Sequence, residues 1–325
     1  MKLNKSASYV LLHMLNGSTT APILSKQLPT IDVRSVQRAL VRLTELGLIS
    51  RDGRTSPTYS VNYKILLETS IDPKLLEDEN RPTSLFRHDF LTWLTELPET
   101  ELSELFNDRE VSSKKETITA RELEHLTVEL SWKSSSLEGN TYTLLDTQLL
   151  LLEGVKAKNK TEFETQMVLN HKNAIAFIME NPALFTGAVE FKAIEELHKL
   201  IGYNLGIDTG IRKRLVKITA SNYEPLAGPH KLREAMDTVL KVISLAKSPF
   251  ARAILALAFI PYLQAFEDGN KRTGRMLANA LLIHSIGQGF SMRKVQAKQL
   301  ALAYLSFYEF GSIHALATIL HDELS

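Results

Sequence analysis

Helical periodicity extends through almost all of residues 123–325, and it constrains the fold more than any other feature of this chain. Apolar residues recur there at intervals of three and four, as on one face of an α-helix. The stretch 212–226 alternates instead and is rich in β-branched residues, so it predicts a small β-hairpin. The fold class is therefore mostly α, a helical bundle with a hairpin flap. The candidate helices run from about 121 to 137, 143 to 153, 161 to 180, 189 to 203, 229 to 245, 249 to 265 and 272 to 286, with two more near the C-terminus.

The composition excludes several classes of protein. The chain has 325 residues and no cysteine, which rules out disulfides, thiolate zinc sites and a cysteine nucleophile. The N-terminus becomes polar too soon for a signal peptide. The most apolar stretch, 253–263, is far shorter than the ~20 residues that span a bilayer. We therefore expect a cytoplasmic protein that does not enter a membrane, and the lack of cysteine is consistent with a reducing compartment.

The first 64 residues are basic. They contain nine Lys and Arg against three Asp and Glu, a net charge of +6, whereas the other 29 Lys and Arg and 34 Asp and Glu give −5. Helical patterns cover 6–15 and 20–27, and a third helix runs from Asp32, its N-cap, to Gly47, its C-cap. The runs LIS and TYSVN then predict a β-hairpin. This pattern over 1–64 resembles the winged-helix family of helix-turn-helix modules.

The third predicted helix has a basic and polar side. In helix-turn-helix modules this helix enters the major groove, where Arg and Gln read base edges and nearby cations bind phosphates. A solvated face on a domain that binds protein, for example in a homodimer, is the alternative that the sequence leaves open. The candidate DNA-binding residues are Arg34, Gln37, Arg38, Arg42, Arg51 and Arg54.

Residues 65–122 connect this basic domain to the body at 123–325. The stretch begins with a polar segment that contains two prolines, which is typical of a linker. Two short amphipathic helices are predicted at 88–97 and 100–108, and neither carries a catalytic constellation. We interpret 65–122 as a helical linker region.

The stretch 264-QAFEDGNKRTGR-275 has the composition of a phosphate and cation site. Asp268 is its one unambiguous hard metal ligand, and Mg²⁺ prefers one or two carboxylates together with water and phosphate oxygens. Gly269 and Asn270 permit a tight turn with inward backbone N–H groups. Lys271 and Arg272 open the next helix, whose N-terminus favours anions, and Arg275 lies one turn later on the same face. These groups together predict a polyphosphate site.

The same stretch resembles the signature of the Fic (filamentation induced by cAMP) family, HxFx(D/E)GNGRxxR or its GNKR variant. Phe266, Asp268, Gly269, Asn270, Arg272 and Arg275 match it. Upstream, 134-SSSLEG-139 matches (S/T)xxxE(G/N), the inhibitory-helix motif of many Fic proteins, with Ser134, Glu138 and Gly139 in the defining positions. The predicted hairpin lies between the two motifs, in the position of the Fic flap. The resemblance covers about 123–320, with the inhibitory helix at about 123–140.

The resemblance implies transfer of AMP from ATP to a hydroxyl of a target protein. Asp268 would hold Mg²⁺ on the phosphates, while Gly269 and Asn270 would form the anion hole and Lys271 would border it. Arg272 would contact phosphate oxygens, and Arg275 would hold the γ-phosphate. Residues 215–226 would hold the target by strand addition. As the brake, Glu138 would pair with Arg275 and repel the γ-phosphate.

Gln264 departs from the pattern because the family has a histidine there as general base. An amide does not accept protons at neutral pH, and general-base catalysis is typically worth ~10²–10⁴-fold. Three functions stay open: a weak, autoinhibited adenylyltransferase, a catalytically silent ATP sensor that regulates DNA binding, and a different phosphoryl or nucleotidyl transfer. His230, which follows the flap in sequence, is the candidate to approach the site and replace the base.

Overall fold

The computed structural model describes residues 3–15, 17–68, 84–87, 89, 117–218 and 221–324. The chain forms two compact units. The first comprises Met1–Ser84, Ile218–Glu224 and Val295–Ile319, and the second comprises Leu85–Lys217, Pro225–Lys294 and Leu320–Ser325. The helices predicted at 88–97 and 100–108 lie, apart from Asp89, outside the described residues.

The first unit begins with three helices and a small antiparallel sheet. The order of its strands is β1-β3-β2, with Thr19 opposite Tyr59 and Ile49 opposite Val61. The helices and the hairpin predicted in 1–64 are confirmed, and β1 is an addition, because two residues are too few to show a period. Its elements are α1 (Lys5–Met14), β1 (Thr19–Thr20), α2 (Ala21–Gln27), α3 (Val33–Glu45), β2 (Ile49–Asp52), β3 (Thr58–Val61), α4 (Tyr63–Glu68) and α15 (Ala297–Phe310).

Helix α3 is amphipathic in the way its sequence predicts. The Asp32 carboxylate accepts a hydrogen bond from Ser35 N at 3.0 Å, so the predicted N-cap is present. Val36, Ala39, Leu40 and Leu43 are buried, and the six candidate DNA-binding residues are exposed. Val33 is 56% exposed, because a first-turn residue at the edge of the apolar stripe has little to pack against.

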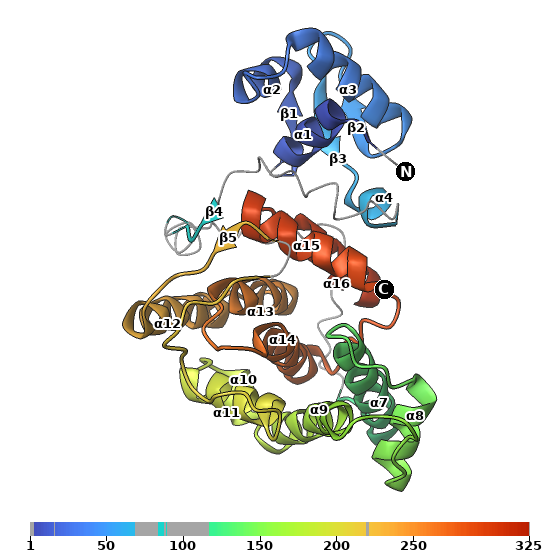
Figure 1. Cartoon of the computed structure of the whole chain (residues 1–325), viewed down its shortest axis with the longest axis vertical. Coiled ribbons are helices and arrows are strands. Elements are labelled where there is room, and N and C mark those ends of the chain that lie inside the picture. Colours follow the sequence, from blue (N-terminus) through green and yellow to red (C-terminus); the bar gives the residue numbers. More distant parts are fainter. Residues whose placement is uncertain are drawn as a thin grey trace. The chain divides into compact units, whose positions relative to one another are not determined.

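The second unit is built around α14, which packs on α9, α10, α11 and α13 (Figure 1). The predicted helices of this region are confirmed with three differences: residues 149–153 of the predicted 143–153 helix form a π-helical turn, α10 was not predicted, and α14 begins at Asn270 rather than 272. The structure has α7 (Ala120–Ser136), α8 (Leu144–Gln148), the π-helical turn η2 (Leu149–Glu153), α9 (Glu162–Glu180), α10 (Ala183–Thr186), α11 (Phe191–Gly202), α12 (Pro229–Leu245), α13 (Pro249–Leu263) and α14 (Asn270–Ile286), with α16 (His314–Leu324) shared between the units. None of the helices that the structure describes combines the length and the apolar character needed to cross a membrane.

Helices α13 and α14 lie in close contact. A Cβ at Gly274 would stand 3.1 Å from both Ala256 O and Pro261 Cδ, so only glycine fits there without a shift of one helix. Every residue from Ala253 to Phe266 is buried. The loop that joins the two helices is therefore held from both sides by a tightly packed core.

The hairpin predicted at 212–226 is not what the structure has. Among the described residues of this stretch the one strand is β5 (Tyr223–Glu224), and it pairs with β4 (Ser84–Leu85). The reason is local. The carbonyls of Arg214 and Leu226 accept hydrogen bonds from the side chain of Arg212, so these carbonyls do not pair with a facing strand of the same segment.

Candidate functional site

The site is formed where α13 ends and α14 begins. Gln264 follows the last residue of α13 in the left-handed region at φ 46°, and Gly269 precedes α14 at φ 80°. These two conformations turn the chain sharply at each end of the loop. Phe266 is fully buried and anchors the middle of the loop. The N-terminus of a 17-residue helix thus faces the residues of the sequence motif.

The side chain of Asn270 closes the loop on itself. Its Oδ1 accepts a hydrogen bond from Phe266 N at 3.0 Å, and its Nδ2 donates to Phe266 O at 2.8 Å. Nδ2 also donates to Gln264 Oε1 at 3.2 Å. Asn270 is 3% exposed, so its amide is committed to holding the loop.

Gln264 is equally committed. Its Nε2 donates to Pro261 O at 2.7 Å, at the carbonyl end of α13, while its Oε1 accepts from Asn270. The residue is 9% exposed. The group in the position of the family base is therefore a hydrogen-bonded cap of α13 with no basic nitrogen.

Asp268 and Arg272 form an ion pair at the mouth of the site. Asp268 Oδ2 accepts from Arg272 Nη2 at 2.9 Å, and Oδ1 accepts from Gly269 N at 2.6 Å. The carboxylate is 68% exposed, whereas the arginine side chain is 3% exposed. Arg272 Nη1 is buried and has no partner among the described residues. An unpaired buried donor of this kind is costly unless a ligand satisfies it.

Arg275 is held by the predicted inhibitory helix. Its Nε donates to Ser134 Oγ at 2.9 Å, and its Nη2 donates to Ser134 O at 3.1 Å and to Glu138 Oε1 at 2.8 Å. The arginine is fully buried and Glu138 is 24% exposed. Burial opposes ionisation of Glu138, but the charges of Arg275 and Lys271 together hold its pKa below the ordinary value. Arg275 Nη1, like Arg272 Nη1, has no partner among the described residues.

The chain turns at Gly139, shortly after the end of α7. Its φ of 92° lies in the left-handed region, where glycine has no steric penalty. The two motifs that the sequence predicted to converge, 134–139 and 264–275, are thus in direct contact through Ser134, Glu138 and Arg275.

A buried histidine supports Ser134 from behind. His171 Nδ1 lies 2.8 Å from Met167 O and must donate to it, which leaves Nε2, 2.8 Å from Ser134 Oγ, as the acceptor of the serine proton. The serine oxygen is then free to accept from Arg275 Nε. Burial, together with the charges of Arg272 and Arg275, lowers the pKa of His171 to about 3. His171 is therefore neutral, as this chain of hydrogen bonds requires.

The neutral His171 predicts a specific loss of stability in acid. Below its ordinary pKa of 6.5 the unfolded chain binds a proton that the folded chain does not bind until about pH 3, so stability falls as the pH falls. This residue alone should lower the free energy of unfolding by about 2 kcal/mol between pH 6.5 and pH 5. Urea titrations at several pH values in this range give the free energy of unfolding of wild-type protein and of His171→Asn. The two proteins are compared by the slope of this free energy against pH. Equal slopes for the two proteins would contradict the prediction.

His198 positions the loop from another helix, α11. Its Nε2 donates to Asp268 O at 2.9 Å, and its ring stacks on Phe266 with 3.8 Å between centroids. Burial lowers the pKa of His198, so the ring is neutral and Nε2 carries the proton. His198 therefore both packs on the loop and hydrogen-bonds to it.

Other histidines of the body lie elsewhere. His230, the candidate that follows the flap, is 87% exposed and lies 3.5 Å from Glu234 on its own helix. His284 Nε2 donates to Ile178 O at 2.9 Å. Neither has a contact with the loop in the described part of the chain, so neither replaces the missing base.

Arg212 is the residue that sequence reasoning missed. It is 3% exposed, and its guanidinium donates to the carbonyls of Gln264, Arg214 and Leu226. Its backbone N–H donates to Ala265 O at 2.9 Å. In sequence it is one cation of the run RKRLVK, and nothing there distinguishes a buried arginine from its exposed neighbours.

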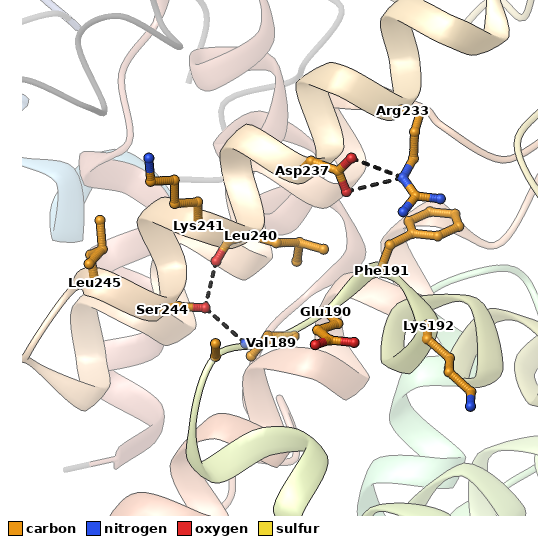
Figure 2. Close-up of a pocket in the computed structure, with 11 residues that line it drawn as sticks. Val189, Glu190, Phe191, Lys192, Arg233, Asp237, Leu240, Lys241, Ser244 and Leu245 are labelled. Atoms are coloured by element: carbon orange, nitrogen blue, oxygen red, sulfur yellow. Dashed lines mark hydrogen bonds and ion pairs between the residues drawn. The ribbon is translucent and has the colours of Figure 1, made fainter.

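A cavity of about 480 Å³ lies beside the site, between the start of α11 and helix α12 (Figure 2). Arg233 lies over the ring of Phe191 at 4.2 Å and pairs with Asp237 at 3.0 Å. Ser244 accepts from Val189 N. Phe191 also stacks against Phe266, with 6.5 Å between the ring centroids. The side of the cavity that Phe191 forms therefore packs against the loop. We assign no chemistry to the cavity, because these polar groups already pair with one another.

Asp268 fits a divalent cation that is shared with a ligand. Each of its oxygens takes one hydrogen bond and keeps a lone pair, and the carboxylate faces solvent. Among the residues that the structure describes, no three His, Cys, Asp or Glu are grouped closely enough to enclose a metal. The donor set suits Mg²⁺ with one carboxylate and the remaining positions filled by water and phosphate oxygens.

Comparison with known proteins identifies the class of domain. Residues 188–282, which include α11, α13, the loop and most of α14, match the model of the Fic/DOC family. The chain therefore contains a Fic/DOC family domain.

Curated relatives match nearly half of this chain. The chain is 27% identical over 159 residues to a protein named protein adenylyltransferase Fic from Nematostella vectensis, a match that spans 47% of this chain and 37% of the relative. It is 25% identical over 156 residues to protein adenylyltransferase fic-1 from Caenorhabditis elegans, over 46% of this chain and 30% of the relative. The chain thus matches about a third of the length of these relatives.

A solved structure supports the fold. A Fic domain containing signaling protein from Bacteroides thetaiotaomicron superposes with a TM-score of 0.52 over 72% of this chain and 93% of its own, at 18% sequence identity. At this identity the likeness concerns the fold alone.

Proposed function

We propose that this chain is a Fic-type transferase that binds Mg·ATP at the start of α14 and moves AMP to a protein hydroxyl, with Glu138 as its brake. The observation that carries the proposal is the pair of buried guanidinium groups, Arg272 and Arg275, each with an Nη1 atom that no described residue satisfies. Two desolvated cations with spare donors, one turn apart at the N-terminus of a long helix, favour a multiply charged anion.

Each motif residue then has a physical role. Arg272 donates to phosphate oxygens, and the backbone of Gly269 and Asn270 lines the anion site. Lys271, beside them, adds a positive charge. Asp268 holds Mg²⁺, which when bound neutralises phosphate charge during transfer.

Glu138 acts as the brake through Arg275. The γ-phosphate needs the Arg275 guanidinium, but the carboxylate already holds Nη2 at 2.8 Å. The Glu138 carboxylate would repel the negatively charged γ-phosphate beside Arg275. ATP would bind weakly and in a pose unsuited to in-line attack.

The transfer itself is limited by Gln264. A target hydroxyl oxygen would attack the α-phosphorus, the bond to the bridging oxygen would break, and pyrophosphate would leave. The hydroxyl proton has to go to water or phosphate, because the Gln264 amide takes none. Positioning and charge stabilisation remain, so slow transfer is the expected wild-type behaviour.

Labelled nucleotide tests this proposal against its two alternatives. The Glu138→Gly protein is incubated with a cell lysate and ATP labelled at the α- or the γ-phosphate. Label on protein from the α-phosphate supports AMP transfer, and label from the γ-phosphate alone supports phosphoryl transfer. Heat of Mg·ATP binding without any label supports a silent sensor, and the absence of heat would overturn all three.

The target is expected to bind along residues 213–217. This stretch belongs to no helix or strand among the described residues, and it presents Leu215 at 77% exposure. A segment outside the sheets can become extended and accept an added strand through its backbone groups. We propose that the target occupies 213–217, which overlaps the predicted 215–226 flap at 215–217, since β5 is already paired.

DNA binding by the first unit is a second candidate function. One observation favours it: Arg34, Gln37, Arg38 and Arg42 all lie on the exposed side of α3, opposite its buried stripe. Such a face suits the major groove, and the exposed Arg51 and Arg54 of the hairpin suit phosphates.

Fluorescence anisotropy with a labelled duplex tests the DNA interaction. Arg34→Ala and Arg38→Ala should each weaken binding and reduce the slope of log affinity against log salt by about 1 for each lost phosphate contact. The control is Arg121→Ala, an exposed arginine of α7. No binding at low salt, or an equal effect of the control, would refute the interaction.

A further inference from the structure

Arg212 joins three parts of the chain that are separate in sequence. Its Nη1 donates to Arg214 O at 2.6 Å and its Nη2 donates to Leu226 O at 2.6 Å. The segment that begins at Arg214 and ends at Leu226 is therefore attached to Arg212 at both ends. The Nε of Arg212 donates to Gln264 O, and its backbone N–H donates to Ala265 O. One buried side chain thus connects the segment to the start of the loop.

The carbonyls at the end of α13 explain why an arginine stands here. The last carbonyls of a helix lack intrahelical partners and carry a partial negative charge, which a guanidinium satisfies. Arginine presents five donors in a rigid planar fork, so it can reach three carbonyls at once. Lysine keeps the charge but has neither the planar shape nor the reach.

The connection continues to the far side of the loop. Gln264, whose carbonyl accepts from Arg212, also accepts at Oε1 from Asn270 Nδ2. Asn270 is the first residue of α14, directly before Lys271 and Arg272. An unbroken series of hydrogen bonds therefore runs from residues 214 and 226 to the helix N-terminus of the anion site.

We propose that Arg212 is a positioning residue that couples the segment 213–217 to the loop, so that nucleotide bound at the loop orders the segment that receives the target. The inference rests on the proposed function, because it takes the loop as the nucleotide site. Coupling is reciprocal: a target on the segment would raise nucleotide affinity by the same factor. Arg212 itself contacts neither nucleotide nor target.

Trypsin supplies a local probe of the segment. Lys213, Arg214 and Lys217 are exposed cleavage sites within it, and cleavage requires local opening of the chain. The rate of cleavage after Lys213 and Lys217 is measured by mass spectrometry on the full chain carrying Glu138→Gly, with and without saturating Mg·ATP. Calorimetry on the same samples measures nucleotide binding independently.

The expected result separates coupling from a merely structural role. Mg·ATP should slow cleavage at least fivefold, and Arg212→Lys should raise the nucleotide-free rate about tenfold, since the loss of two hydrogen bonds makes opening easier. In Arg212→Lys, bound Mg·ATP should change the rate less than twofold. The matched control is Arg214→Lys, an exposed change that keeps a trypsin site and should retain the full nucleotide effect. Arg212→Gln serves in the same way if Arg212→Lys fails to fold.

Each contrary result has its own meaning. If calorimetry shows bound nucleotide but cleavage is unchanged, or if Arg212→Lys keeps the full slowing, the coupling is refuted and the nucleotide site stands. If no nucleotide binds, the proposed function fails and the coupling fails with it. An unaltered nucleotide-free rate in Arg212→Lys would refute the positioning role in every case.

Discussion

Replacing Gln264 by histidine in protein that also carries Glu138→Gly should raise the rate of AMP transfer from α-labelled ATP by ~10²–10⁴-fold, the usual contribution of a general base. The backbone accepts this change, because residue 264 lies at φ 46° and histidine is among the residues enriched in that region. The rate should also rise with pH as the new imidazole loses its proton. Transfer of label to protein, followed across pH 5.5–8.5, measures both effects.

A matched variant shows whether the gain is due to the base. Gln264→Asn keeps an amide, suits the same backbone conformation and supplies no basic nitrogen, so it should stay near the starting rate. If Gln264→His and Gln264→Asn were equally slow while both bound Mg·ATP, the proposal of AMP transfer at this site would be wrong. The silent sensor would then be the better account.

Neutralising the brake should tighten Mg·ATP binding by about 10- to 100-fold, the usual strength of a hydrogen bond between charged groups. In Glu138→Gln the side chain keeps its size but loses the negative charge that lies 2.8 Å from Arg275 Nη2 in the wild-type protein. Calorimetry with Mg·ATP at pH 7.5 gives both affinities. Because the pKa of Glu138 is held below its ordinary value of 4.5, lowering the pH to 5.5 should not reproduce the effect in wild-type protein.

A carboxylate elsewhere on the same helix controls for net charge. Glu124 is exposed on α7, so Glu124→Gln removes the same charge without touching Arg275, and it should change the affinity less than twofold. Equal affinities for wild type and Glu138→Gln would show that the ion pair does not restrain the nucleotide. The assignment of 134–139 as an inhibitory motif would then be wrong for this chain.

Local patterns were sufficient to predict most of the helices and the convergence of the motif. Apolar spacing placed α9, α12 and α13 within a residue or two, because burial of one helical face leaves a period in the sequence. Thr143 and Asp146, a Thr and an acid three residues apart, form a capping box in which both hydrogen bonds are present. The two family motifs predicted that Glu138 meets Arg275, which the structure confirms at 2.8 Å.

The sequence by itself therefore determined the helical class and the lack of a basic nitrogen at Gln264, and it predicted a polyphosphate site at 264–275. Only the tertiary structure decided what holds these groups in place: His171 behind Ser134, His198 beneath Asp268, and Arg212 across the end of α13. The physical reason is that a hydrogen bond between distant segments leaves no period in the sequence. A buried arginine and an exposed one are the same letter until the fold places carbonyl oxygens around one of them.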